Sequence, residues 1–438
     1  MSDKLAAKLK NVNKLMQLGD LVAALSEVEY LKIDHSDVGD VWALDGEIAI
    51  RQRRTEDAIQ AVERAVELDP HIVERHIQRA RCYIVAGNTE EARKSALQAL
   101  KSEVKRLDHL LILGGALVRC NEHAKALNVY LKAKELSRDN ANVHRGLASV
   151  YRFLGDLEKA EIACNEAIRL DPHDYEMIGL RSSLRKQTKE SNHVNEIVKL
   201  ERSGLKNWRG VVHVAYALSK EYEDLEEYEL SFTWLKHGAS IKRKNLKYDL
   251  QDDIKIFDTL KTAFSSDRIA GFGETGDPSS DPIFVLGMPR TGSTLVERII
   301  SSHSMVQNVG ELSSFSFAMM NQIETQGNGQ MGSRLALAEN STQLRMKELA
   351  QEYLKSVEPL RNDSPRFVDK LPLNSLNIGL IYAALPNAKI VHVERNHMDT
   401  CYAIYKFLFK NGYPFSYDLE ELAVYYVEYY RLMQHWRD

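Results

Sequence analysis

The stretch "FVLGMPRTGSTLVERIISSH", residues 284–303, decides the fold of the second half of the chain. A short apolar run, "IFVLG" (residues 283–287), ends in a turn of glycine, proline and arginine, and a helical pattern follows. Such a run is typical of a strand buried on both faces of a parallel sheet. A glycine turn between strand and helix presents unpaired backbone N–H groups to an anion. The stretch therefore predicts an α/β domain with a phosphate-binding loop, "GMPRTGST", over residues 287–294.

This loop differs from the loop of nucleoside triphosphatases. Their loop reads G-x4-G-K-[ST], with a lysine for the β/γ-phosphates and a hydroxyl for Mg²⁺. Here Ser293 stands in place of the lysine, and the cation of the loop is Arg290. A P-loop kinase that binds a nucleoside triphosphate through Mg²⁺ is therefore an alternative, and not the leading interpretation.

Two further strands are predicted, and each ends in a cation. The runs "RFVDK" (residues 366–370) and "KIVHVER" (residues 389–395) flank the helical pattern "NSLNIGLIYAAL", which gives a strand, a crossover helix and a strand. Ligands of open parallel sheets bind outside the carboxyl ends of the strands. We therefore expect Arg290, Lys370 and Arg395 to converge on one anion. The alternatives are a solvated surface charge for each cation and a local ion pair within "DK" for Lys370.

The first half of the chain repeats itself. Alanines recur every 34 residues, at Ala24, Ala58, Ala92, Ala126 and Ala160. The clearest copy is "ANVHRGLASVYRFLGDLEKAEIACNEAIRLDP", residues 141–172, in which "LGD" is expected to turn one helix into the next. The period and the small residues resemble the tetratricopeptide repeat, whose helix pairs cross closely where side chains are small. The resemblance implies a superhelix whose concave groove binds a protein or peptide; a rigid spacer or dimerisation arm is the alternative.

The second half resembles the sulfotransferases. "PRTGST" matches their 5'-phosphosulfate loop, usually written P-[RK]-[ST]-G-[ST]-T. "VHVERNHMDTCYAIYKFLF" (residues 391–409) is similar to their 3'-phosphate strand and helix, typically R-[DN]-P-x-D with a serine eight residues after the arginine. "VGELSSF" (309–315) and "VDKLPLN" (368–374) match as well. With the repeats in front, nearly the whole chain resembles the tetratricopeptide-repeat sulfotransferases of bacteria, relatives of the tyrosylprotein sulfotransferases.

The resemblance implies a reaction and a role for each matching residue. The donor would be 3'-phosphoadenosine 5'-phosphosulfate, with no metal. Glu311 would act as general base on the acceptor hydroxyl, and Lys370 would steady the bridging oxygen. Arg290 would stabilise the transferred sulfuryl group. The residues implied to bind the donor are Arg290, Thr291, Gly292, Ser293, Thr294 and Arg395. For Glu311, a cap or surface charge on a glycine turn is the alternative.

Some positions depart from the family pattern. His397 stands where proline is usual, and Ala403 stands where a serine hydroxyl would meet the 3'-phosphate. Losing one neutral hydrogen bond costs about 0.5 to 1.5 kcal/mol, so weaker donor binding is expected rather than its loss. Leu312 and Ser313 replace the second acid of members that act on acidic peptides, so tyrosine-rich acidic peptides are not supported as acceptors. The acceptor hydroxyl of a sugar, a small molecule or a protein tyrosine stays open.

The domain organisation follows from these patterns. We expect a repeat array over 1–188, divergent helical pairs over 189–264 that cap and link it, and a sulfotransferase domain over 281–438. The segment "SSDRIAGFGETGDPSSDP", residues 265–282, is the expected boundary. Only three strands are readable and the last pattern is helical, so the resemblance implies a domain that is either truncated at its C-terminus or naturally short there, and full activity of this 438-residue form is not expected. A repeat scaffold with a degenerate, inactive sulfotransferase-like domain is the alternative to an enzyme.

Composition restricts the partners. The net charge of -4 gives no basic footprint for nucleic acid. The four cysteines are scattered without metal-ligand spacing, which favours a reduced compartment. No apolar run reaches the length of about 18 residues that a membrane span needs, and the N-terminal pattern does not resemble a signal peptide. We therefore expect a cytoplasmic protein that binds no nucleic acid and spans no membrane; a homodimer stays open.

Overall fold

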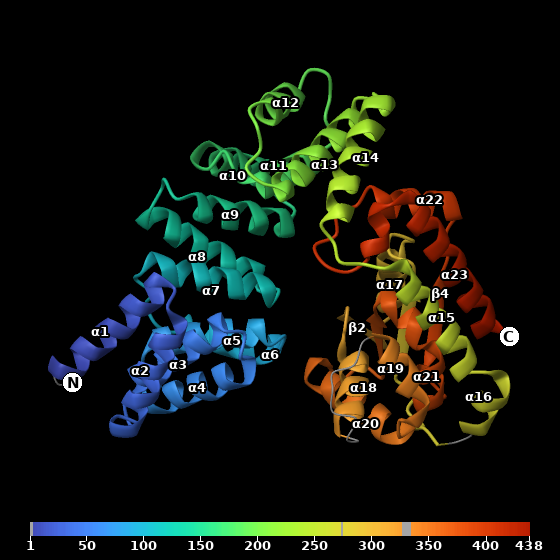
Figure 1. The fold of residues 1–438 in the computed structure, drawn as a ribbon, viewed down its shortest axis with the longest axis horizontal. Helices are drawn as coiled ribbons and strands as arrows, with labels where there is room; N and C mark the ends of the chain where they lie inside the picture. The colour runs from blue at the N-terminus through green and yellow to red at the C-terminus, as the bar shows by residue number, and fades with distance from the viewer. Residues whose placement is uncertain (1–2, 273–274, 326–333) are drawn as a thin grey trace. The chain divides into compact units, whose positions relative to one another are not determined.

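The computed structural model describes residues 3–272, 275–325 and 334–438 (Figure 1). The chain divides into two compact units. Unit 1 comprises Met1–Lys206 and Lys220–Glu227, and unit 2 comprises Asn207–Ser219 and Tyr228–Asp438. Helix α13 (Trp208–Asp224) contributes residues to both units. Residues 273–274 of the expected boundary segment lie outside the described residues, and the domain limits stay predictions.

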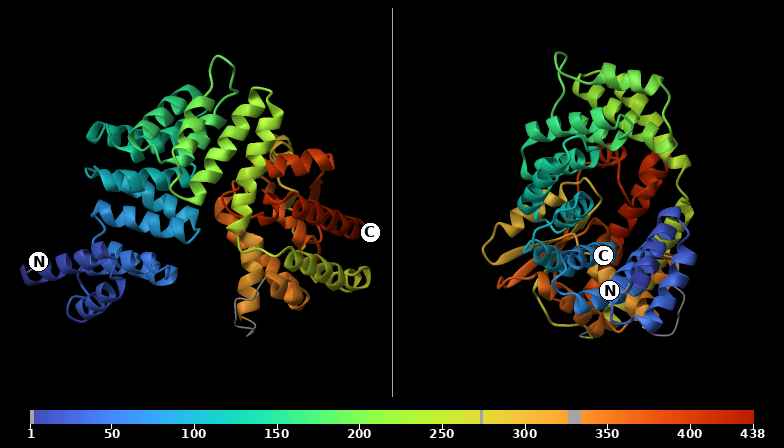
Figure 2. Two further views of the ribbon diagram at one scale, coloured as in Figure 1. Left: turned by 45° about the horizontal axis from the view of Figure 1, so that its top comes forward. Right: turned by 90° about the vertical axis from the view of Figure 1, so that its left-hand side faces the viewer.

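Unit 1 consists of helices, stacked in antiparallel pairs (Figures 1 and 2). They are α1 (Asp3–Leu18), α2 (Leu21–Asp34), α3 (Gly39–Arg51), α4 (Thr55–Leu68), α5 (Val73–Val85), α6 (Thr89–Ala99), α7 (Leu107–Arg119), α8 (His123–Leu136), α9 (Ala141–Leu154), α10 (Leu157–Leu170), α11 (Tyr175–Ser183) and α12 (Val194–Arg202). The five repeated alanines are at most 1% exposed, because they lie where the helices of a pair cross. At Gly46 a Cβ would lie 2.7 Å from Val62 Cγ1, so a larger side chain would force the pair apart.

The turns between the paired helices follow from local chemistry. Helix α9 ends at Leu154, and Gly155 adopts the left-handed conformation (φ 82°) that glycine tolerates without a steric penalty. Asp156 then caps α10 by accepting a hydrogen bond from the Lys159 N–H at 3.2 Å. The helix-to-helix turn predicted at "LGD" is confirmed.

Unit 1 also includes a buried acid from helix α13. Glu221 is fully buried and accepts hydrogen bonds from the Ser182 hydroxyl at 2.6 Å and the His193 N–H at 2.6 Å. Its carboxylate also lies 3.1 Å from His193 Nδ1. A buried carboxylate is tolerated only when its oxygens are bonded in this way. Residues 182, 193 and 221 therefore form one polar cluster within unit 1.

Unit 2 combines helices with one parallel sheet. Its further helices are α14 (Tyr228–Lys244), α15 (Leu250–Ala263), α16 (Ser266–Phe272), α17 (Ser293–Ser301), α18 (Ser314–Thr325), α19 (Arg334–Asn340), α20 (Met346–Val357), α21 (Ile378–Ala384), α22 (His397–Tyr405) and α23 (Leu419–Arg437), with short 3-10 turns η1 (Ser341–Gln343), η2 (Glu358–Leu360), η3 (Pro372–Asn377) and η4 (Pro414–Tyr417). The strands are β1 (Pro282–Gly287), β2 (Val306–Gly310), β3 (Arg366–Lys370) and β4 (Lys389–Val393).

The sheet has the order β2-β3-β1-β4, with all neighbours parallel. The central strand β1 is buried at every position, as its apolar run predicts. The sequence predicted three strands, and the structure adds β2 at one edge. Its residues are half-buried or exposed and include Gln307 and Asn308, so it lacks the apolar run that marks the central strands. The fold is an all-α repeat array followed by a parallel α/β sheet, as expected.

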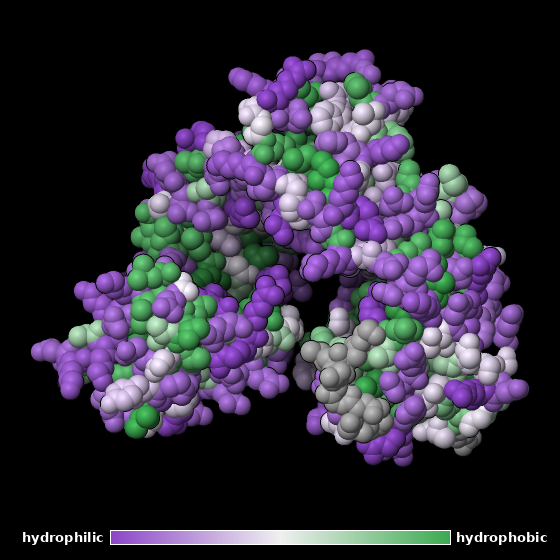
Figure 3. Space-filling view, viewed as in Figure 1, coloured by the Kyte–Doolittle hydropathy of each residue, from purple (hydrophilic) through white to green (hydrophobic). Residues whose placement is uncertain are grey.

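The surface of the molecule mixes polar and apolar side chains (Figure 3). Within the described ranges, the helices are all too short or too polar to cross a membrane.

Candidate active site

The loop after β1 is shaped by close backbone contact. At Gly287 (φ 148°) a Cβ would lie 2.5 Å from the carbonyl oxygen of Val393, so only glycine lets the end of β1 pass β4 this closely. The buried Thr291 hydroxyl donates to the Met288 carbonyl at 2.8 Å and closes the turn. Gly292 (φ 99°) then starts α17. Both glycines of the turn have a positive φ, and at Gly287 the neighbouring carbonyl also leaves no room for a side chain.

The same loop leaves a row of donors unpaired. Within the described part of the chain, the backbone N–H groups of residues 290–294 make no hydrogen bond. The next one, from Leu295, donates to the Gly292 carbonyl at 2.9 Å. The Ser293 side chain is buried, and Thr294 is exposed. Free N–H groups at the N-terminus of a helix attract an anion through the local dipole.

Arg290 lies on this loop with a left-handed backbone (φ 68°), which is uncommon for a residue with a side chain. Its guanidinium stacks 4.5 Å from the centre of the Phe407 ring, in the segment that follows α22. This cation–π contact orients the arginine while leaving it exposed. Phe407 was not singled out from the sequence, because nothing in a single sequence pairs it with Arg290.

Lys370 and Glu311 form a direct ion pair. Lys370 ends β3 and its side chain is 6% exposed, whereas Glu311 follows β2 and is 58% exposed. The lysine is thus held by the sheet, and the carboxylate is the partner that can turn away. The alternative of a local ion pair within "DK" is wrong, because Asp369 accepts a hydrogen bond from the Tyr353 hydroxyl at 2.9 Å on the other face of the strand.

Two buried acids surround this pair. Burial raises the pKa of Asp369 to about 7, and the Tyr353 hydrogen bond opposes that rise. Burial also raises the pKa of Glu297 on α17, while the Lys370 charge lowers it. The sequence analysis missed both residues. The only signal for Asp369 was its place beside Lys370, and Glu297 stands in a helix pattern that gave no sign of burial.

The β4 side of the sheet is more open. Arg395 has a side chain 47% exposed and pairs with Asp399 at 3.4 Å. Asn396 caps α22 by accepting hydrogen bonds from the Met398 and Asp399 N–H groups at 2.9 and 3.2 Å. The half-buried Ala403 lies further along α22 and offers no hydroxyl.

Two histidines, His392 on β4 and His397 on α22, lie near Arg395 in the sequence. His392 contacts the Tyr429 hydroxyl at 2.6 Å through Nε2, and burial lowers its pKa. His397 is exposed at the first position of α22. His392 therefore packs within unit 2, whereas His397 is solvated.

Strand register brings these residues to one edge. Val285 pairs with Lys370 across β1 and β3, and Gly287 pairs with Val393 across β1 and β4. The carboxyl ends of the three strands therefore lie side by side, and the residues that follow them share that edge. No group of three or more His, Cys, Asp or Glu side chains in the described ranges is arranged to hold a metal ion.

Comparison with known families matches both halves of the chain. The sulfotransferase family model matches residues 282–438, and tetratricopeptide repeat models match residues 49–111 and 141–174. An uncharacterized protein of Aquifex aeolicus (strain VF5) is 28% identical over 382 residues, which cover 85% of this chain and 49% of that protein. The chain thus spans about half the length of this relative.

Solved structures of tetratricopeptide repeat proteins are similar to part of the chain. A tetratricopeptide repeat protein from Parabacteroides merdae has a TM-score of 0.39 and 16% identity, and covers 55% of this chain and 94% of its own. The PilF protein of Pseudomonas aeruginosa has a TM-score of 0.35 and 20% identity, with coverages of 45% and 89%. From the family matches, the chain combines tetratricopeptide repeats with a domain of the sulfotransferase family over residues 282–438.

Proposed function

We propose that the chain transfers a sulfuryl group from 3'-phosphoadenosine 5'-phosphosulfate to an acceptor hydroxyl, and that the repeat array binds the acceptor or a partner protein. The observation that carries this proposal is the ion pair of the buried Lys370 with Glu311 at the sheet edge that also holds the anion-binding loop. A cation and a carboxylate in contact supply the two charges that such a transfer needs.

The residues of the loop fit a phosphosulfate donor. The free N–H groups of residues 290–294 and the Arg290 guanidinium would hold the 5'-phosphosulfate. The loop has the buried Ser293 where a triphosphatase has its lysine, so the fit does not depend on a metal-bound triphosphate. Arg395, exposed after β4, would reach the 3'-phosphate.

The ion pair of Lys370 and Glu311 would open once substrates are bound, and each residue would then take a different role. Lys370 is fixed on β3 and would donate a hydrogen bond to the bridging oxygen as negative charge grows there. Glu311 is exposed and would leave the lysine to accept the proton of the acceptor hydroxyl. Sulfuryl transfer resembles phosphoryl transfer in relying on positioning and charge stabilisation. The acceptor hydroxyl belongs in this proposal to a sugar, a small molecule or a protein tyrosine; a cytoplasmic location and a homodimer remain predictions.

The test is a calorimetric titration of 3',5'-adenosine bisphosphate into the full chain with a chelator present. We expect binding, and we expect Arg290→Ala to weaken it by about tenfold or more. The matched control is Arg298→Ala, an exposed arginine on helix α17, which follows the loop. Tighter binding of ATP with Mg²⁺ would favour a P-loop kinase instead. Absence of binding to a folded chain would overturn the proposal in favour of a repeat scaffold.

A transfer assay tests the chemistry separately. Radiolabelled donor is incubated with the chain and a phenol, a hexose or a tyrosine peptide. Glu311→Gln keeps the shape of the side chain and removes its basicity, so we expect it to abolish transfer and to leave bisphosphate binding within about threefold. Equal transfer by the wild type and Glu311→Gln would show that Glu311 is not the base.

A further inference from the structure

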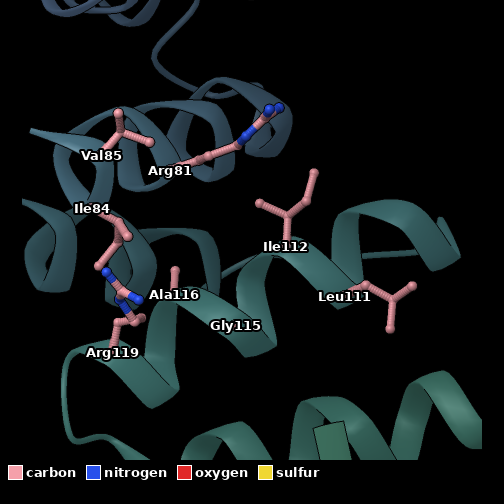
Figure 4. Close-up of a pocket in the computed structure, with 8 residues that line it drawn as sticks. All are labelled: Arg81, Ile84, Val85, Leu111, Ile112, Gly115, Ala116 and Arg119. Carbon is pink, nitrogen blue, oxygen red and sulfur yellow. The ribbon is translucent and has the colours of Figure 1, made fainter. Parts of the chain in front are cut away.

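A groove lies along three helices of unit 1, α5, α7 and α9. Two adjoining hollows of about 560 and 420 Å³ share Leu111, Ile112, Gly115 and Arg119 in their walls, so they form one continuous groove. Its remaining lining is mostly apolar. Figure 4 shows Ile84 of α5 and Arg119 of α7 pointing toward each other, and Figure 3 shows apolar surface over α7 and its neighbours.

The floor of the groove is made by glycines and one tyrosine. Tyr130 comes from α8, and its ring fills the space where side chains on Gly114 and Gly146 would lie. A Cβ at Gly114 would lie 2.7 Å from a ring atom of Tyr130, and a Cβ at Gly146 would lie 2.1 Å from one. At Gly115, by contrast, a Cβ would meet only the Tyr130 hydroxyl, at 3.9 Å. The tyrosine thus reaches between α7 and α9, and its hydroxyl lies at the floor beside Gly115.

The Tyr130 hydroxyl is an unpaired donor among the described residues. The residue is 6% exposed, and in the described part of the chain its hydroxyl makes no hydrogen bond. Burial raises its pKa to about 12, so it stays a donor at neutral pH. The hydroxyl is accessible at the floor of the groove, so it can donate a hydrogen bond to a ligand atom there.

The charges in the groove are of one sign. Its lining includes Arg81, Arg119 and Arg145 and no carboxylate among the described residues. Arg81 already pairs with Glu47 at 2.8 Å, and Arg145 pairs with Asp174 at 2.7 Å. Arg119 is exposed and makes no ion pair or hydrogen bond within the described ranges. It lies one helical turn from Gly115, so it and the Tyr130 hydroxyl border the same part of the floor.

We propose that this groove binds a protein segment in which a carboxylate side chain stands next to aliphatic side chains. The carboxylate receives hydrogen bonds from Arg119 and the Tyr130 hydroxyl, and the aliphatic groups cover Gly115, Ile112 and Ile84. The three arginines exclude a basic segment, and the apolar walls exclude a purely acidic one. This inference rests on the proposed function of the repeat array and names the class of partner.

The test measures fluorescence anisotropy with the full chain and a labelled nonapeptide in which three leucines alternate with two glutamates between Gly–Ser ends. Control peptides carry glutamine in place of glutamate, or serine in place of leucine. We expect the first peptide to bind at least about tenfold tighter than either control. The glutamine peptide loses the charged hydrogen bond, and the serine peptide loses the apolar burial. Equal affinity for the three peptides, or no binding, overturns the proposal.

Variants locate the site. Arg119→Ala is expected to weaken binding about tenfold or more, and Tyr130→Phe about three- to tenfold. Arg64→Ala removes an exposed arginine on α4, paired only with Glu67, and should change nothing. Gly115→Leu has room for its Cβ and raises helix propensity, so it should keep the melting temperature and abolish binding by filling the floor. A Gly115→Leu chain that melts normally and binds the peptide as the wild type does contradicts the site.

Two further measurements separate the alternatives. If the groove instead held a second copy of this chain, sedimentation would show a dimer that Gly115→Leu converts to monomer, and that outcome contradicts the proposal. The same variants are titrated with 3',5'-adenosine bisphosphate. Nucleotide binding without peptide binding overturns the groove alone, and peptide binding without nucleotide binding overturns the sulfotransferase proposal alone.

Discussion

The central strands and the edge strand of the sheet support different kinds of functional residue. Central strand β3 carries Lys370 and Asp369 at 5% and 0% exposure, and β1 leads into a loop fixed by Gly287 against β4. Edge strand β4 leads to Arg395, whose side chain is 47% exposed and whose only ion-pair partner in the described ranges is Asp399.

The difference lies in what holds each group in place. In the centre, neighbouring strands on both sides and packed helices fix the backbone, so donors are preorganised before any ligand arrives. At the edge, one neighbour is missing, and the arginine must be ordered by its ligand at an entropic cost. We therefore expect changes at buried central positions to affect both folding and binding, and changes at exposed positions such as Arg395 to affect binding alone.

The largest expected effect is that of Gly287→Ala. The new Cβ would meet the Val393 carbonyl at 2.5 Å on a backbone with φ 148°, and such overpacking plus strain costs roughly 4 kcal/mol. The control is Gly310→Ala, which has φ 88° but open space and should cost about 1 kcal/mol. Denaturation of the full chain measures both. Equal losses would mean that the β1 to β4 contact does not hold the loop.

The second effect concerns pH. Burial raises the pKa of Asp369 to about 7, so the folded chain keeps a proton that the unfolded chain releases near pH 4. The contribution of this group to stability is full below about pH 4 and is lost as the pH rises to about 7. Asparagine does not titrate, so the Asp369→Asn variant does not lose this stability as the pH rises. The free energy of unfolding of the variant minus that of the wild type should therefore increase by about 2 to 3 kcal/mol between pH 5 and pH 8. If calorimetry finds the same stability difference between the two proteins at every pH, the proton is not held by Asp369.

A smaller effect separates the two anion sites. Arg290→Ala should weaken both AMP and 3',5'-adenosine bisphosphate by about 2 kcal/mol, because it serves the 5' side. Arg395→Ala should weaken only the bisphosphate by a similar amount. The melting temperature of each variant should stay close to that of the wild type, since both side chains are exposed. Loss of AMP binding in Arg395→Ala would show that the edge arginine does not serve the 3'-phosphate.

The smallest expected effect is a gain in affinity for 3',5'-adenosine bisphosphate. Ala403→Ser on α22 supplies the hydroxyl that this chain lacks near the edge, and it should tighten bisphosphate binding by about 1 kcal/mol. AMP has no 3'-phosphate and serves as the control ligand. If affinity for both ligands rises equally, the hydroxyl acts through helix α22 and not through the 3'-phosphate.

The sequence predicted the features that depend on period and on strong local signals. The strand at 366–370 and the turn at "LGD" match the structure residue for residue, because an apolar run and a glycine followed by a capping acid each fix local geometry. Strand β2 was not predicted, because an edge strand does not need an apolar run. The burial of Asp369 and Glu297 was not predicted, because distant segments decide whether an acid is buried. For Asp369 one such segment is helix α20, which carries Tyr353.

The polar cluster around Glu221 bears on synthesis of the chain. Ser182 lies on α11 and His193 directly precedes α12, yet the carboxylate that bonds them arrives only with residue 221 on α13. Domains tend to fold during translation as soon as their last required residue has emerged. This cluster of unit 1 can therefore form only after Glu221 has been synthesised, and a chain released before that point would leave both donors without their acceptor.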